Sequence, residues 1–169
     1  MSTESDDKKQ SLGAQGDGTA QRLDHAGYGK SVMRAVAGTQ FVDGGLSVRV
    51  DYGRGSAQID GVVSDVAVEL ESRNWPQLRT ACQNLARHPC PKKLLVLMYQ
   101  RARRCADSCR ALLSQSLATE DFRVVELMGW GGHPDTGDSE IVRKALSELG
   151  WKPATGTALS NAGRPSSVS

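Results

Sequence analysis

Hydrophobic residues alternate with polar ones along several short stretches of the chain and follow helical spacing along others. Alternation with a period of two indicates half-buried strands, and a spacing of three to four residues indicates helices. The alternation predicts strands at 46–52, 57–63, 66–71 and 122–128. An unbroken apolar run at 93–99 is typical of a central strand buried on both faces. The helical spacing predicts helices at 28–38, 74–88, 101–118 and 138–150.

These elements follow one another in the order α-β-β-β-α-β-α-β-α. Three successive strands followed by alternating helices and strands predict an α/β fold with a mixed central sheet flanked by helices. Residues 1–26 are rich in Ser, Asp, Gln and Gly and hold almost no large apolar side chain, so we expect a disordered N-terminal tail. Residues 153–169 resemble them in composition and predict a C-terminal tail. One folded domain at 27–152 remains.

Composition excludes several classes of protein. The longest apolar run, 94–98, is far shorter than the roughly 20 residues of a membrane-spanning helix, so we expect no membrane partner. The first 30 residues are polar, which predicts no signal peptide. The four cysteines are then expected to be reduced thiols in a cytoplasmic protein, and their spacing matches no zinc motif.

The most informative segment is the pair of strands at 57–63 and 66–71. If Ser64 and Asp65 form a two-residue turn, Asp60 lies opposite Glu69 on the neighbouring strand. Because side chains alternate along a strand, Glu69 and Glu71 point to the same face. The sequence therefore predicts three carboxylates on one patch of the sheet.

Like charges opposed across two strands are destabilising, and a bound cation removes the repulsion. Carboxylate oxygens are hard ligands that suit Mg²⁺ or Mn²⁺, so Asp60 and Glu69 are candidate metal ligands. The alternative is a solvated sheet face on which the acids are ordinary outward-facing residues. A register slip of one residue would also move Asp60 to the other face.

Asp60 followed by Glu69-Leu70-Glu71 on the next strand, then a basic helix and an apolar strand, resembles the PD-(D/E)XK nuclease superfamily. The resemblance covers roughly residues 28–128. It implies a restriction-endonuclease-like α-β-β-β-α-β core that hydrolyses nucleic-acid phosphodiesters with Mg²⁺. Asp60 and Glu69 then match the acidic positions of the superfamily, and Glu71 stands where Lys is usual. All three are candidate catalytic residues.

The charge distribution favours the same class of substrate. The stretch 72–110 holds nine basic residues and one acidic residue, although the whole chain carries a net charge of only +2. Such a concentration is typical of polyanion binding, and the alternative is two solvated helix faces. Few aromatic residues are available for stacking, which favours duplex DNA over single strands. The candidate phosphate-binding residues are Arg73, Arg79, Lys92, Lys93, Arg101, Arg103 and Arg104.

The sequence therefore predicts a small metal-dependent nuclease. A catalytically inactive nucleic-acid-binding or assembly module with the same fold is the alternative. A third hypothesis is a protein-interaction domain that binds no nucleic acid. The oligomeric state stays open, with a homodimer as one option.

Overall fold

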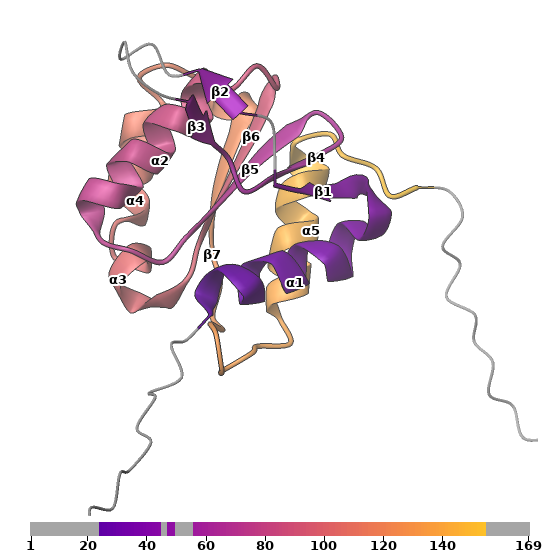
Figure 1. Ribbon diagram of the computed structural model, residues 1–169. Coiled ribbons are helices and arrows are strands. Elements are labelled where there is room, and N and C mark those ends of the chain that lie inside the picture. The colour runs from indigo at the N-terminus through magenta and orange to yellow at the C-terminus, as the bar shows by residue number, and fades with distance from the viewer. Residues whose placement is uncertain (1–23, 45–46, 50–55, 155–169) are drawn as a thin grey trace, which may run out of the picture.

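A computed structural model of the chain describes residues 24–44, 47–49 and 56–154. The predicted N-terminal tail lies outside the described residues except for its last three, and so does the C-terminal tail beyond residue 154. His25 and Ala26, which the sequence places in the tail, belong to the first helix. The described chain forms three layers, with a central sheet between two groups of helices (Figure 1). The predicted mixed α/β sheet flanked by helices is confirmed.

The elements occupy short, well-separated segments of the chain. The α-helices are α1 (His25–Ala37), α2 (Trp75–Arg87), α3 (Tyr99–Arg103), α4 (Ala106–Leu113) and α5 (Asp138–Glu148). Two 3₁₀ turns are η1 (Gly38–Gln40) and η2 (Thr119–Asp121). The strands are β1 (Phe41–Asp43), β2 (Ser47–Arg49), β3 (Ser56–Gln58), β4 (Gly61–Val63), β5 (Val66–Glu71), β6 (Lys92–Leu97) and β7 (Phe122–Glu126).

The central sheet has five strands in the order β1-β4-β5-β6-β7. β1, β4 and β5 pair antiparallel, whereas β5, β6 and β7 pair parallel. Of the predicted strand at 46–52, residues 47–49 form β2, which pairs with β3 in a separate two-stranded sheet, and the remaining residues lie outside the described ones. Its place is taken by β1, a three-residue strand too short to leave a periodic signal in the sequence.

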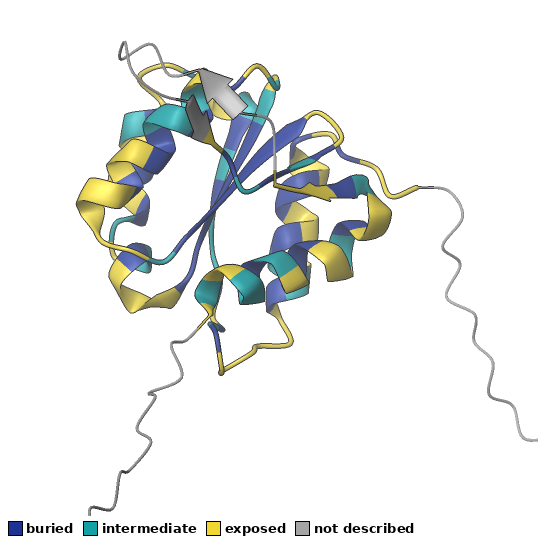
Figure 2. Cartoon of the chain, in the orientation of Figure 1, coloured by how far each residue is buried: buried dark blue, intermediate teal, exposed yellow. Residues whose placement is uncertain are grey.

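Each face of the sheet is covered by its own hydrophobic core. Val66, Val68 and Leu70 of β5 pack with buried residues of α1 and α5. Ala67 on the opposite face packs with buried residues of α2 and α4. Figure 2 shows the buried strands between helices whose outer surfaces are exposed. The predicted alternation along 66–71 is therefore confirmed, and Glu69 and Glu71 share their face with Ala67.

The turn between β4 and β5 has the predicted length. Val63 pairs with Val66, so Ser64 and Asp65 alone connect the strands. Gly61 pairs with Val68, which places Asp60 across from Glu69. Ser64 adopts a positive φ of 54°, which is uncommon for a residue with a side chain. The register on which the acidic patch depends is thus confirmed.

Two predicted elements are divided in the structure. The strand at 57–63 is interrupted at Ile59 and Asp60, because β3 pairs with β2 while β4 enters the central sheet. The helix at 101–118 is divided into α3 and α4 by a turn at Arg104 and Cys105. Neither break falls on a Gly or Pro, since residues 59–60 are Ile and Asp and residues 104–105 are Arg and Cys.

The loop between β7 and α5 is held by Asp138, the first residue of α5. Asp138 is fully buried, and its carboxylate accepts hydrogen bonds from the backbone N–H of Met128 (2.7 Å) and Gly129 (2.9 Å). It also accepts one from the Tyr28 hydroxyl of α1 (2.6 Å). The N-cap position itself is occupied by Gly137. A single buried carboxylate therefore ties β7, α5 and α1 together.

Within the described part of the chain, no helix is long and apolar enough to cross a membrane.

We expect Ser64→Gly to stabilise the protein. A first turn residue with positive φ suits glycine, and relieving the strain should raise the free energy of unfolding by roughly 0.5–1 kcal/mol. Denaturant unfolding followed by circular dichroism measures the change. An unchanged or lower stability would argue against this turn and against the register that it sets.

Candidate functional site

A cleft of about 910 Å³ opens where the parallel strands end at their carboxyl edge. In doubly wound sheets this edge is the usual place for ligands. The cleft is bordered by the start of α1, the end of β5, the start of α2 and α3. Its lining residues are Asp24, His25, Ala26, Asp60, Leu70, Glu71, Ser72, Arg73, Asn74, Gln77, Tyr99 and Arg101.

Asp60 and Glu69 are held against each other beside this cleft. The backbone N–H of Asp60 donates to Glu69 Oε2 (3.0 Å), and the backbone N–H of Leu70 donates to Asp60 Oδ2 (2.8 Å). Asp60 is half-buried and lines the cleft, whereas only 8% of the Glu69 surface is exposed. The structure therefore brings the two predicted metal ligands together.

The environment of Glu69 favours its neutral form. Burial is the main cause, and the negative charge of Asp60 adds to it; together they raise the pKa of Glu69 from 4.5 to about 9. A cation beside the pair would oppose this effect, because it stabilises the ionised form.

Glu71 also lies at the cleft, but its oxygens are already engaged. Oε1 accepts hydrogen bonds from the backbone N–H of Ser72 (2.9 Å) and of Arg73 (2.9 Å). The Arg73 guanidinium binds both oxygens, with Nε 2.8 Å from Oε1 and Nη2 2.6 Å from Oε2. Glu71 is 3% exposed, whereas the Arg73 side chain is 66% exposed. Arg73 therefore brings a positive charge to the cleft while its guanidinium is held by Glu71.

The donor set at this edge suits a hard divalent cation. Asp60 and Glu69 offer carboxylate oxygens, and Mg²⁺ commonly uses one or two carboxylates and keeps several water ligands. Across the described residues, however, no three His, Cys, Asp or Glu side chains are gathered so as to hold a metal ion. The pair therefore fits a partly hydrated Mg²⁺ or Mn²⁺, with Glu71 outside the ligand set while Arg73 binds it.

The predicted phosphate-binding residues do not form one surface. Arg73 and Arg101 line the cleft. Arg79 on α2 and Arg104 after α3 are exposed outside the cleft lining. Arg103 is half-buried between Glu126 (4.0 Å from Nε) and the sulfur of Met128 (3.3 Å from Nη2).

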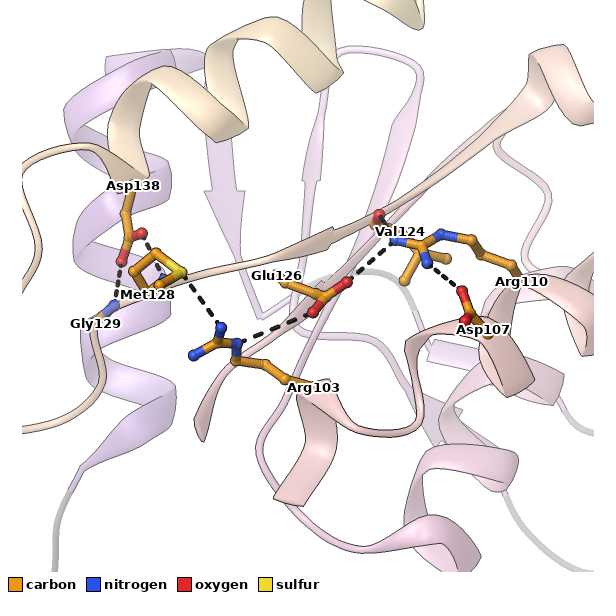
Figure 3. A network of polar contacts seen from close by, with 8 residues as sticks. All are labelled: Arg103, Asp107, Arg110, Val124, Glu126, Met128, Gly129 and Asp138. Atoms are coloured by element: carbon orange, nitrogen blue, oxygen red, sulfur yellow. Dashed lines mark hydrogen bonds and ion pairs between the residues drawn. The ribbon is translucent and has the colours of Figure 1, made fainter. Parts of the chain in front are cut away.

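Figure 3 shows the carboxylate of Glu126, the last residue of β7, between the guanidinium groups of Arg103 and Arg110. Arg110 approaches the same carboxylate (3.3 Å) and also binds Asp107 (2.7 Å). Much of the local positive charge is therefore neutralised within the fold, and Arg103 contributes to packing at β7.

Lys92 and Lys93 lie at the opposite edge of the sheet, because they pair with the first residues of β5. Lys92 forms an ion pair with Asp121 (2.6 Å). Lys93 is 2% exposed, and its ammonium donates to the backbone carbonyls of His88 (2.5 Å) and Cys90. Burial lowers the pKa of Lys93. A lysine buried at the far edge of the sheet cannot contact a phosphate in the cleft, so the predicted phosphate-binding role of Lys93 is wrong. Lys93 instead anchors the loop before β6.

A row of aromatic rings that the sequence does not predict runs from the cleft to the loop after β7. His25 stacks on Tyr99 with ring centroids 5.2 Å apart, and Tyr99 meets the edge of Trp130 at 5.8 Å. Trp130 in turn lies 4.9 Å from His133. Tyr99 and Trp130 follow β6 and β7, so the convergence of parallel strand ends was the available signal.

Comparison of the chain with protein-family models, with curated proteins and with solved structures finds no match.

We expect the stability of the metal-free protein to fall as pH rises from about 5 to 9. The unfolded chain ionises Glu69 near pH 4.5 while the folded protein keeps the proton up to about pH 9, so rising pH favours the unfolded state across this window. Glu69→Gln cannot ionise and should remove this loss. Urea unfolding in EDTA at pH 5, 7 and 9 measures it.

Glu148→Gln is the matched control. Glu148 is an exposed acid at the end of α5, and its hydrogen bond with Arg123 lowers its pKa, so it stays ionised across this pH range. It should keep the wild-type pH dependence above pH 5. Equal slopes for wild type and Glu69→Gln would show that Glu69 ionises normally in the folded protein.

Proposed function

We propose that the cleft binds nucleic acid and hydrolyses its phosphodiester bonds with a Mg²⁺ or Mn²⁺ ion held by Asp60 and Glu69. The observation that carries this proposal is the position of Asp60 across from Glu69, fixed by the β4–β5 register and by the hydrogen bond from the Asp60 N–H to Glu69, beside a cleft that also holds Arg73 and Arg101. The order α1, β1, β4, β5, α2, β6 supports it as well, because it is the order that the resemblance to PD-(D/E)XK nucleases implies.

The residues of the chain have distinct roles in this proposal. Asp60 is oriented by the Leu70 N–H, so one of its oxygens has a fixed direction before any ligand arrives. To hold the cation together with Asp60, Glu69 would have to lose the proton that its burial favours. A cation held there would supply a more acidic water and would stabilise the negative charge that develops on the phosphoryl oxygens.

Arg73 connects the acidic pair to the substrate. Its guanidinium is held by Glu71 while most of its side chain remains exposed, so it can bind a phosphate oxygen without a large loss of side-chain freedom. Arg101 enters the cleft from α3 and offers a second phosphate contact. Glu71, which stands at the usual Lys position of the superfamily, thus positions Arg73.

A non-catalytic nucleic-acid-binding module is the second candidate function. It is favoured by the engagement of both Glu71 oxygens by Arg73, which leaves only two acids for a cation. The basic residues and the cleft serve this function equally. A cytoplasmic location accompanies both candidates, in keeping with the four free thiols.

Millimolar Mn²⁺ or Mg²⁺ should raise the melting temperature relative to EDTA. A ligand that binds only the folded state at a hundredfold excess over Kd adds about 2.7 kcal/mol to the free energy of unfolding. The same ions should support cleavage of circular single-stranded and plasmid DNA. Asp60→Asn and Glu69→Gln should abolish both effects and still bind DNA, since the arginines of the cleft are untouched.

Glu148→Gln again serves as the matched acidic control, and it should respond to metal and cleave as wild type does. Metal binding without cleavage would favour the non-catalytic module. Identical melting in EDTA and Mn²⁺, with no metal binding by calorimetry, would contradict the proposed cation site.

DNA affinity should fall with salt, but modestly. The two arginines of the cleft give a slope of log affinity against log salt of about −1.4 to −1.8, because each phosphate contact contributes roughly −0.7 on a single strand and −0.9 on duplex DNA. Arg101→Gln should make the slope shallower by one such contact. Arg123→Gln is the control, since Arg123 pairs with Glu148 outside the cleft lining. A slope unaffected by Arg101→Gln would place DNA on another surface.

A further inference from the structure

We propose that the rings of His25, Tyr99 and Trp130 form a stacking site for an unpaired nucleobase, so that the cleft takes a single-stranded segment of nucleic acid. This inference rests on the proposed function, because it assumes that nucleic acid enters the cleft. It reverses the preference for duplex that the low aromatic content predicts. The protein has few aromatic residues, but the fold gathers three rings at one edge.

The exposure of Tyr99 gives the site its binding surface. Tyr99 and His25 both line the cleft that contains Asp60 and Glu71. Tyr99 is 37% exposed although it stacks on His25 with ring planes 28° apart. A large ring that remains exposed beside acidic and basic groups is a feature of sites that bind bases by stacking.

The rings are fixed before any ligand binds. The backbone N–H of Gly131 donates to His25 Nδ1 (3.2 Å), which joins the loop of Trp130 to the start of α1. A Cβ atom on Gly131 would lie 2.6 Å from the backbone carbon of Asp24, so only glycine allows this approach. Trp130 and His133 exchange backbone hydrogen bonds of 2.9 and 2.8 Å across the turn. A preorganised row of rings loses little freedom when a base stacks on it.

The backbone at Tyr99 is also unusual. Its φ is +66°, a conformation that a residue with a bulky side chain rarely adopts. The preceding Met98 is buried in the core on the α1 side of the sheet, whereas Tyr99 begins α3 at the cleft. The strained residue therefore lies at the point where the buried strand gives way to the exposed ring.

The arrangement distinguishes unpaired bases from paired ones. In a duplex the flat faces of the bases are covered by their neighbours, whereas a single strand, an overhang or a flipped nucleotide exposes them. A base on Tyr99 would leave its phosphates in the cleft shared by Arg101 and Arg73. The stacking site thus selects the strand form, and the arginines bind the backbone.

The test compares binding of labelled DNA in EDTA, where no cleavage occurs, by fluorescence anisotropy. The probes are a 12-nucleotide single strand, the matched duplex, the duplex with a single-stranded overhang, and a single strand of abasic residues. Wild type should bind the single strand and the overhang at least tenfold more tightly than the duplex or the abasic strand.

Tyr99→Asn is the decisive variant, because Asn tolerates a positive φ and so removes the ring without adding strain. It should weaken binding of the single strand about tenfold to a hundredfold, the loss expected for one base–aromatic stack, and leave duplex binding unchanged. Tyr99→Phe should bind like wild type. Trp75→Leu is the matched control: Trp75 is also 37% exposed but lies outside the cleft lining. Thermal unfolding of each variant confirms that it is folded.

Equal binding of single strand and duplex by wild type, or equal losses on both for Tyr99→Asn, would overturn the stacking site. The proposed hydrolysis is measured separately, with Mn²⁺ on the same probes. If the protein cleaves DNA but Tyr99→Asn binds single strand and duplex as wild type does, the stacking site alone is rejected. If binding of the single strand depends on Tyr99 but no probe is cleaved, hydrolysis alone is rejected. Absence of binding to every probe rejects both.

Discussion

Two carboxyl groups from neighbouring strands, those of Asp60 and Glu69, are held together inside the fold. Burying them is unfavourable unless they are hydrogen-bonded, and the backbone N–H groups of Asp60 and Leu70 supply those bonds. The two-residue turn at Ser64 and Asp65 fixes the pairing, and β5 is enclosed between β4 and β6, so the register cannot slip. The cleft, the burial of Glu71 and the position of Arg73 all follow from where β5 ends.

Local patterns were sufficient to predict the part of the molecule that lies in the middle of the sheet. The alternation along 66–71 correctly predicted which residues of β5 point to each face of the sheet. Each face is buried against a different helical layer. The helical spacing at 74–88 likewise predicted α2, which has Pro76 in its first turn, and Gly150 after α5 adopts the positive φ typical of a helix end. These features depend on residues close in sequence, and so a single sequence carries them.

Features that depend on distant contacts could not be predicted. Nothing near Glu126 in the sequence shows that Arg103 and Arg110 will approach it. These contacts pair two arginines of the basic stretch 72–110 with an acid inside the fold, away from the cleft lining. In the sequence Lys93 cannot be told from a surface lysine. In the fold its ammonium is buried against the backbone carbonyls of His88 and Cys90 in the loop before β6. The same holds for the ring row, since His25 and Trp130 are brought together by the docking of a glycine-rich loop on α1.

The division of the core into two separate layers gives each face of the sheet its own spectroscopic reporter. The buried thiols of Cys82 and Cys109 belong to the α2–α4 side, whereas Trp151 is buried on the α1–α5 side. The rate at which a thiol reagent reaches the first pair therefore records opening of one side. The emission of Trp151, measured with Trp75 and Trp130 replaced by Phe, records loosening of the other. Agreement between the two would mean that both halves open as one cooperative unit, and a difference would identify which side of the sheet opens first.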